Sequence, residues 1–216
     1  MKKLWTSVFA ALLLLAFMLP AQAAINDRIE SAQALFLSEL AIESPTLIEG
    51  TAHESGYFFF VHRDKEGNPI WAEVAFNGLD DEGESSFLDC YLRATNCPSN
   101  FYLRLSDAST PCSIAETDAL AAASAGEPST NGYAANLIER SATGWPTLVL
   151  DSGDYQATAS TETFVASGGP WGPVYCAFIG TTSDNTGKLI SHAALSTGRT
   201  LAAGESLQVT YKIKQQ

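Results

Sequence analysis

Two runs of alternating residues between positions 163 and 195 predict a pair of strands that forms the centre of the fold. Residues 174–179 carry apolar side chains at both odd and even positions, so both faces of this strand are apolar. Such a strand is expected in the middle of a sheet, buried on both sides. Residues 189–195 form the second run, and Ser-Asp-Asn-Thr-Gly at 183–187 favours a turn between the two.

Similar alternation predicts further strands along most of the chain. They are expected at residues 57–61, 70–76, 101–105, 133–140, 147–150, 156–159, 162–166 and 207–213. Helices are predicted at residues 26–40, 85–92 and 113–123, the last opened by a capping box at residues 113–116. Many short strands with few helices are typical of an antiparallel β-sandwich, immunoglobulin-like or jelly-roll-like, so we predict a mainly β fold class.

The first residues of the chain have the features of a signal peptide, assigned to residues 1–23. Lys2 and Lys3 precede a mostly apolar run at 4–19, and Ala-Gln-Ala at 21–23 has the small residues of a cleavage site. We therefore predict export to the periplasm or the medium; an uncleaved membrane anchor is the alternative. The remaining chain is divided into an N-terminal helix and hairpin extension at residues 24–69 and a β-sandwich domain at residues 70–216.

A β-prone aromatic run forms the first strand of the predicted hairpin, and the turn residues lie at 64–69. The run consists of Tyr57, Phe58, Phe59, Phe60 and Val61. An exposed aromatic edge strand invites pairing with another chain. We therefore predict that this run is the interaction edge of the protein.

The charge of the chain excludes some classes of partner. The formal net charge is -12, and removal of residues 1–23 takes away two lysines and no acid, which gives -14. A surface this acidic repels nucleic-acid phosphate and anionic lipid. We therefore predict no nucleic-acid partner, and no membrane partner after cleavage of the signal peptide.

The cysteines of an exported chain are expected to be oxidised to structural disulfides. They are Cys90, Cys97, Cys112 and Cys176, and their spacing matches no zinc site. Four cysteines can pair in three ways, and the sequence does not choose among them. Pairing of Cys90 with Cys97 and of Cys112 with Cys176 is preferred, because the short loop of the first pair is easy to close.

The sequence predicts no enzyme and no catalytic, cofactor-binding or metal site. Its histidines are His53, His62 and His192. We interpret His62 as a solvated turn residue and His192 as a packed or edge-exposed strand residue. The chain has no G-x-S-x-G elbow, no H-E-x-x-H motif and no P-loop. Three acids close in sequence, Asp151, Asp154 and Glu162, would suit glycosidase chemistry only at the right separation in space.

Two groups of residues have both a structural and a functional interpretation. The acidic loops at 80–82 and 184–185 could bind calcium, but they match no EF-hand loop, and acids at 80–84 are also expected where a helix begins. A set of aromatic residues could form a ligand platform, although we expect them to fill the core. They are Phe58, Phe59, Phe60, Trp71, Trp145 and Trp171.

Several motifs, in order along the chain, resemble a family of tailed-phage virion structural proteins. They are AFNGLDDEGE at residues 75–84, LD at 88–89, LRAT at 92–95, FYLRLSD at 101–107, NGYA at 131–134, GGPWGPV at 168–174, GKLI at 187–190, AALS at 193–196 and GESLQVTY at 204–211. The similarity covers about residues 71–213. The family usually has Gly where this chain has Ala94.

The resemblance implies a non-enzymatic structural protein of tail, tail-fibre or capsid-associated type, without cofactors. Its partners would be other copies of the chain or other virion proteins, and it would be associated with the virion. One alternative is an exported bacterial surface-binding module, adhesin-like or carbohydrate-binding, with a cell-surface glycan as partner. The other is an exported hydrolase. In the first two cases a rigid, disulfide-bonded surface would serve assembly or adhesion.

Overall fold

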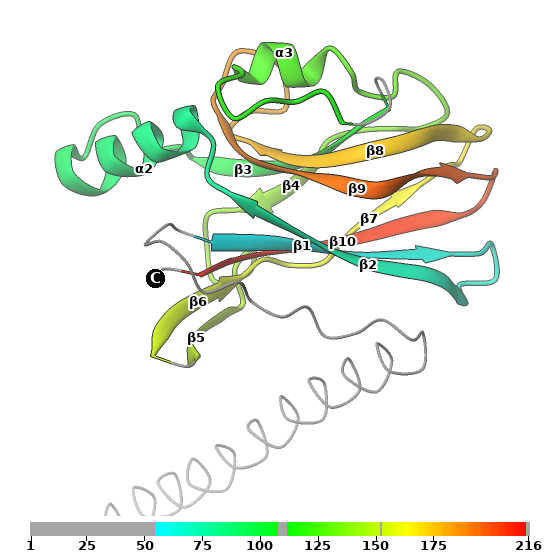
Figure 1. The fold of residues 1–216 in the computed structure, drawn as a ribbon, viewed down its shortest axis with the longest axis horizontal. Helices are drawn as coiled ribbons and strands as arrows, with labels where there is room; N and C mark the ends of the chain where they lie inside the picture. The colour runs from blue at the N-terminus through cyan, green and yellow to red at the C-terminus, as the bar shows by residue number, and fades with distance from the viewer. Residues whose placement is uncertain (1–54, 108–111, 152, 215–216) are drawn as a thin grey trace, which may run out of the picture. The chain divides into compact units, whose positions relative to one another are not determined.

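The computed structural model describes residues 55–107, 112–151 and 153–214. The predicted signal peptide, the helix at 26–40 and His53 lie outside these residues. The described chain is mainly β and forms two antiparallel sheets, with β8 and β9 stacked above β1, β2 and β10 in Figure 1. The predicted mainly β, antiparallel sandwich is confirmed.

The first sheet has six strands. Five of them follow the order β2-β1-β10-β6-β5, and the sixth, β7, pairs with β10 on the same side as β6. The strands are β1 (Ser55–Arg63), β2 (Pro69–Gly78), β5 (Thr147–Asp151), β6 (Asp154–Thr158), β7 (Glu162–Val165) and β10 (Ser206–Lys214). β10 is the central strand of this sheet, because it pairs with β1 along one side and with β6 and β7 along the other.

The second sheet has four strands in the order β4-β3-β8-β9. They are β3 (Asn100–Ser106), β4 (Asn136–Glu139), β8 (Trp171–Gly180) and β9 (Leu189–Leu201). β8 lies between β3 and β9, and its residues from Cys176 to Ile179 are fully buried. The predicted central strand with two apolar faces is therefore confirmed.

Each face of β8 belongs to a different core. Ala177 and Ile179 face the space between the sheets, which is filled mainly by aromatic and aliphatic side chains. The largest of these are Phe58, Phe60, Leu103, Leu105, Leu207, Val209 and Tyr211. Cys176 and Phe178 face outward and are covered by the segment that carries α3 (Leu120–Ser124). Figure 1 shows α3 above this outer face.

The division at residue 70 and the interaction edge at residues 57–61 do not agree with the structure. β1 and β2 do form the predicted hairpin, but β1 pairs with β2 on one side and with β10 on the other. The hairpin is therefore an integral part of the sandwich, and Tyr57, Phe58, Phe59, Phe60 and Val61 have no free backbone edge. Phe58 and Phe60 are fully buried, because their side of the strand faces the other sheet.

Other predicted elements change in length or position. The predicted capping box does not form, because the Asp118 carboxylate accepts a hydrogen bond from the Ala115 N–H and closes a turn; α3 begins at Leu120. The strand predicted at 133–140 shortens to β4, because the Tyr133 ring packs against Phe164 and Trp171.

The helix predicted at 85–92 is longer and extends over α2 (Asp81–Arg93). It ends at Ala94, whose φ of 51° lies in the left-handed region. This conformation favours glycine, so alanine is an unusual residue at this position.

Both preferred disulfides are present. Cys90 of α2 is bonded to Cys97 in the loop before β3, with a Cα–Cα distance of 4.6 Å. Cys112 is bonded to Cys176 of β8, with a Cα–Cα distance of 5.4 Å. The second bond attaches the α3 segment to the outer face of the second sheet. Among the described residues, no helix is long and apolar enough to cross a membrane.

Candidate interaction surface

The acidic run at residues 80–84 attaches α2 to the start of β9. The Asp80 N–H donates to the Ile190 carbonyl at 3.0 Å, and Asp80 Oδ1 lies 2.7 Å from His192 Nδ1. Glu82 Oε2 accepts hydrogen bonds from the backbone N–H of Leu189 at 2.8 Å and of Leu120 at 3.2 Å. These carboxylates have partners in the protein and act as anchors of the helix.

A glycine lets the helix approach β9 this closely. A Cβ on Gly83 would lie 2.2 Å from the Ile190 carbonyl oxygen, so no larger residue fits without moving the helix. Among the described residues no group of three or more His, Cys, Asp or Glu side chains could hold a metal. Asp80, Glu82 and Gly83 of the run NGLDDEGE therefore dock α2 against β9.

The two anchoring carboxylates have opposite pKa shifts. Burial raises the pKa of Asp80 above its usual value, and the nearby Glu116 and Asp118 add to this, while the contact with His192 opposes it. Burial alone would also raise the pKa of Glu82. Hydrogen bonds from the Leu189 N–H, Lys188 and the Leu120 N–H outweigh it and hold the pKa of Glu82 below its usual value.

The Asp80 carboxyl gives a pH-dependent contribution to stability. Since its pKa is higher in the folded than in the unfolded state, its contribution is complete below pH 3.8 and is lost as the pH rises through the folded-state pKa. Asn at this position keeps the acceptor for His192 and cannot ionise. As the pH rises through the folded-state pKa of Asp80, we expect the free energy of unfolding of Asp80→Asn to increase relative to that of the wild type. Urea unfolding at several pH values measures this difference. A difference that is the same at all pH values would contradict the prediction.

The outward face of α2 is apolar and exposed. Buried residues of the helix are Gly83 and Ser86, near its beginning, so the later turns extend away from the sandwich. In these turns Leu88 is 59% exposed, Tyr91 88% and Leu92 70%. The predicted apolar face of this helix therefore exists, but it does not pack on the domain in the structure.

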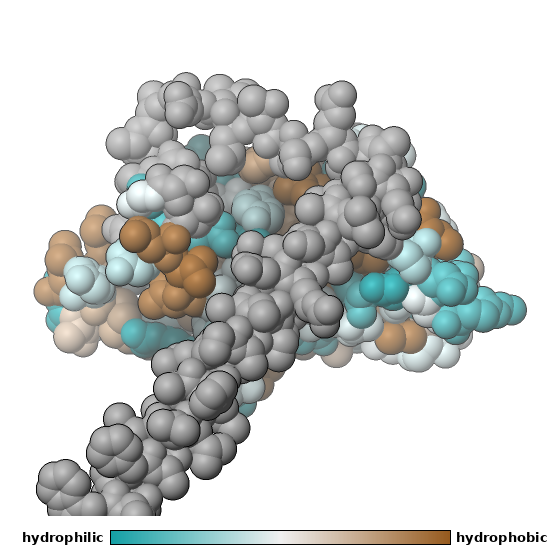
Figure 2. Space-filling view, turned by 90° about the horizontal axis from the view of Figure 1, so that it is seen from below, coloured by the Kyte–Doolittle hydropathy of each residue, from teal (hydrophilic) through white to brown (hydrophobic). Residues whose placement is uncertain are grey.

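The hairpin of β5 and β6 carries a second group of exposed apolar side chains. Leu148 is 69% exposed, Leu150 63% and Tyr155 59%, and Val149 between the two leucines is 38% exposed. β5 is also an edge strand of the first sheet, with β6 on one side and no strand of the described chain on the other. We call the exposed apolar residues of β5 and β6 the apolar end. Figure 2 shows hydrophobic surface on the left side of the molecule, where Figure 1 places these elements.

His62 and His192, the histidines within the described residues, each pair with a carboxylate. His62 is only 6% exposed, and its Nε2 lies 2.9 Å from Glu205 Oε2. The prediction of a solvated turn residue is wrong, because β1 extends to Arg63 and the ring lies within the sheet. His192 is packed against Asp80, as expected. The neighbouring Ser191 points to the other face of β9 and donates to the Gly78 carbonyl, so these residues do not form a hydrolase triad.

The three acids considered for glycosidase chemistry are not gathered into one site. Glu162 lies on β7 opposite Val209, and its carboxylate accepts a hydrogen bond from the Ser160 hydroxyl. Asp154 lies at the start of β6 near Lys214, with 3.8 Å between the charged atoms. Val209 and Lys214, the β10 residues next to these two acids, are roughly 17 Å apart at the usual rise of a strand. Asp151 is opposite Asp154 in the same hairpin.

The aromatic residues mostly fill the core, as expected. Phe58, Phe60 and Trp171 are buried, and Trp71 and Trp145 are partly buried against the core. The exposed apolar residues of β5 and β6 were not recognised from the sequence. The alternation at 147–150 predicts a strand, but it gives no sign that this strand lies at the edge of a sheet.

Comparisons with protein-family models, with curated proteins and with solved structures found no match for the chain. The fold and the surface define a disulfide-bonded antiparallel β-sandwich with an exposed apolar end. This class of protein is the starting point for the functional proposal.

Proposed function

We propose that the protein is a non-enzymatic structural protein, of tailed-phage virion type, that assembles with further copies of itself through the apolar end. The observation that supports this most directly is the open edge of β5 with three exposed aliphatic side chains. A soluble monomer rarely leaves an apolar edge strand uncovered, because it templates pairing with another chain. The resemblance of residues 71–213 to virion proteins supports the same role.

The charge of the protein favours contact at this strand. With a net charge of -12, two copies repel each other over most of their surfaces. Residues 145–150 carry no charged side chain. Antiparallel pairing of β5 with its copy about Val149 would place Leu148 of each chain opposite Leu150 of the other. Such a two-fold contact is the commonest form of self-association.

The assembly state of the purified, oxidised protein tests this proposal. We expect the wild type to form dimers or larger assemblies whose mass, measured by light scattering during gel filtration, increases with concentration. The double variant Leu148→Lys/Leu150→Lys adds four charges to each two-fold contact and should be monomeric. Ile70→Lys/Val165→Lys is the matched control, since both residues are exposed and lie toward the opposite end of the first sheet.

A monomeric wild type at its highest soluble concentration would reject self-assembly. Equal dissociation of both double variants would show that added charge, and not β5, is responsible. Circular dichroism and thiol titration of each variant check that the fold and both disulfides are retained.

We infer that the protein is exported, with residues 1–23 as the cleaved signal peptide. Two disulfides in the described chain are compatible with an oxidising compartment. Expression of the full chain in a secreting bacterium, followed by mass spectrometry of the periplasmic and secreted fractions, tests this. An N-terminus at or near Ala24 is the expected result, and an uncleaved chain in the membrane fraction would contradict it.

A further inference from the structure

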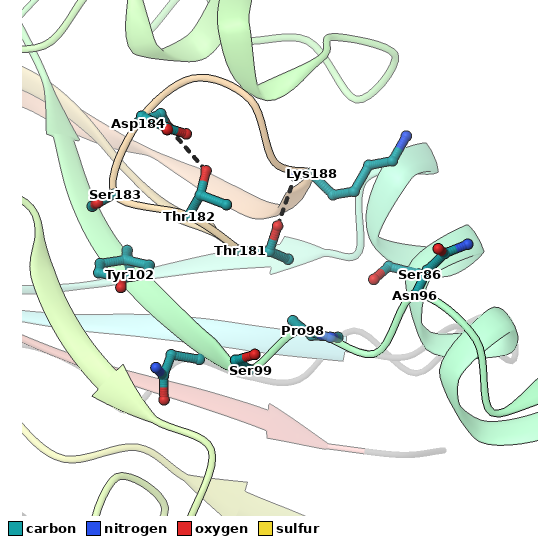
Figure 3. A pocket seen from close by; sticks show the side chains of 11 residues that line it. Ser86, Asn96, Pro98, Ser99, Tyr102, Thr181, Thr182, Ser183, Asp184 and Lys188 are labelled. Carbon is teal, nitrogen blue, oxygen red and sulfur yellow. Dashed lines mark hydrogen bonds between the residues drawn. The ribbon is translucent and has the colours of Figure 1, made fainter.

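A polar hollow lies between α2, β3 and the turn from β8 to β9. Its volume is about 450 Å³, which is enough for a small ligand. Figure 3 shows Tyr102 of β3 next to Thr182 and Ser183 of the turn, with Ser86 and Asn96 on the far side. No residue of β5 or β6 lines the hollow, so binding there does not require self-assembly.

The walls of the hollow are held in place by the protein itself. Arg104 is only 2% exposed. Its guanidinium group donates to the carbonyl oxygens of Asp184 at 2.7 Å and of Thr182 at 3.4 Å. The Thr181 hydroxyl accepts from the Lys188 N–H at 2.9 Å. On the opposite side the Cys90–Cys97 disulfide closes the loop that leads to β3. The site is therefore preorganised, which reduces the entropy cost of binding a ligand.

Several hydroxyl groups of the hollow have no hydrogen-bond partner among the described residues. They belong to Ser86, Ser99, Tyr102 and Ser183. Ser86 is 7% exposed, and Ser99 and Ser183 are exposed, so these hydroxyls are open to a ligand that enters the hollow. A ligand that donates and accepts hydrogen bonds would satisfy these groups.

The charges of the hollow favour a neutral ligand. Lys188 is paired with Glu82 at 3.1 Å, and Arg104 is paired with Glu127, so both cations already have a carboxylate partner. Hydrogen bonds from the Thr186 hydroxyl and N–H lower the pKa of Asp184, which is therefore ionised at neutral pH. Most residues that line the hollow are polar, and Tyr102 is the aromatic residue among them.

We propose that this hollow binds a neutral saccharide. A sugar ring presents adjacent hydroxyl groups that both donate and accept, which matches the unpartnered hydroxyls and the Asp184 carboxylate. Its apolar C–H face matches the single aromatic ring of Tyr102. One exposed hexose unit of a surface glycan is the size of ligand that fits. This gives the protein a carbohydrate-binding function in addition to assembly.

The test is a titration of the oxidised protein with glucose, galactose, mannose and N-acetylglucosamine, each followed by NMR of the backbone amides. We expect at least one sugar to shift the resonances of Ser99, Tyr102 and Thr182, with a Kd on the order of 1 mM. Tyr102→Phe removes one hydroxyl and keeps the ring, so the Kd should rise about fivefold. Thr143→Val removes an exposed hydroxyl outside the hollow, and it should bind as the wild type does.

Three results would overturn the proposal. The first is the absence of shifts at these residues with all four sugars. The second is equal affinity of Tyr102→Phe and the wild type. The third is a response to sodium phosphate or glucuronate without a response to any neutral sugar, which would make the hollow an anion site. Because all of these measurements can be made on the monomeric Leu148→Lys/Leu150→Lys variant, failure here is distinguishable from failure of the assembly proposal.

Discussion

Replacing Cys112 and Cys176 together by alanine should lower the free energy of unfolding by about 4 kcal/mol. The disulfide joins residues 64 positions apart, so its removal releases a long loop in the unfolded state. In the folded state Cys176 is fully buried beside Phe178, under the α3 segment. Alanine avoids placing a polar group at this buried position.

Urea unfolding of the oxidised proteins measures this difference. The matched control is Cys90→Ala/Cys97→Ala, whose disulfide spans 7 positions and should contribute only about 2 kcal/mol by the same loop-entropy estimate. Equal losses in the two double variants, or a larger loss in the control, would refute the assignment of the longer bond as the main covalent stabiliser.

Replacing Arg104 by methionine should cost about 3–5 kcal/mol of stability, the usual result of breaking a buried ion pair from one side. Arg104 Nε donates to Glu127 Oε1 at 2.9 Å, and a second guanidinium nitrogen contacts Glu127 Oε2. The substitution leaves the Glu127 carboxylate buried with the Tyr133 hydroxyl as its remaining partner. Burial and the adjacent carboxylate already raise the pKa of Tyr133, so that hydroxyl stays neutral and cannot replace the cation.

The control for this substitution is Arg93→Met on the surface of α2. Arg93 is paired with Asp89 at 2.7 Å, but its side chain is 72% exposed, so its loss should cost less than about 0.5 kcal/mol. Thermal and urea unfolding compare the two variants. Similar losses would mean that the Arg104 pair contributes no more than an exposed one.

In Arg104→Met the turn at 181–184 also loses two hydrogen bonds from the guanidinium group, so amide exchange in this turn should become faster.

Local patterns were sufficient to predict much of the sandwich. The Asp64–Asn68 turn, the two-sided apolar character of β8 and the alternation of β10 are each properties of a few consecutive residues, and all agree with the structure. The preferred disulfide pairing also rested on a local fact, the short loop between Cys90 and Cys97. A mainly β class follows from the number of such patterns.

The position of each strand in its sheet could not be predicted in this way. β1 is covered by β10, from the other end of the described chain, and β5 has no such partner. Both strands are rich in apolar residues, so their composition does not reveal which one lies at the edge. The same limit applies to α2, since its periodicity indicates an apolar face but not whether anything packs on it. For this reason the sequence assigns the interaction edge to residues 57–61, which lie inside the first sheet, whereas β5 is one of its edge strands.

The place of β10 in the first sheet determines when the protein can complete its fold during synthesis. β1 and β2 leave the ribosome early, but β10, which lies beside β1, is the last strand of the sandwich to be made. Until then β1, which carries Phe58 and Phe60, has β2 as its partner strand and lacks β10 on its other side. Contacts this distant along the chain form slowly. A nascent chain that stays unfolded until its last strand emerges would suit the export proposed above, because a translocation channel admits an unfolded chain.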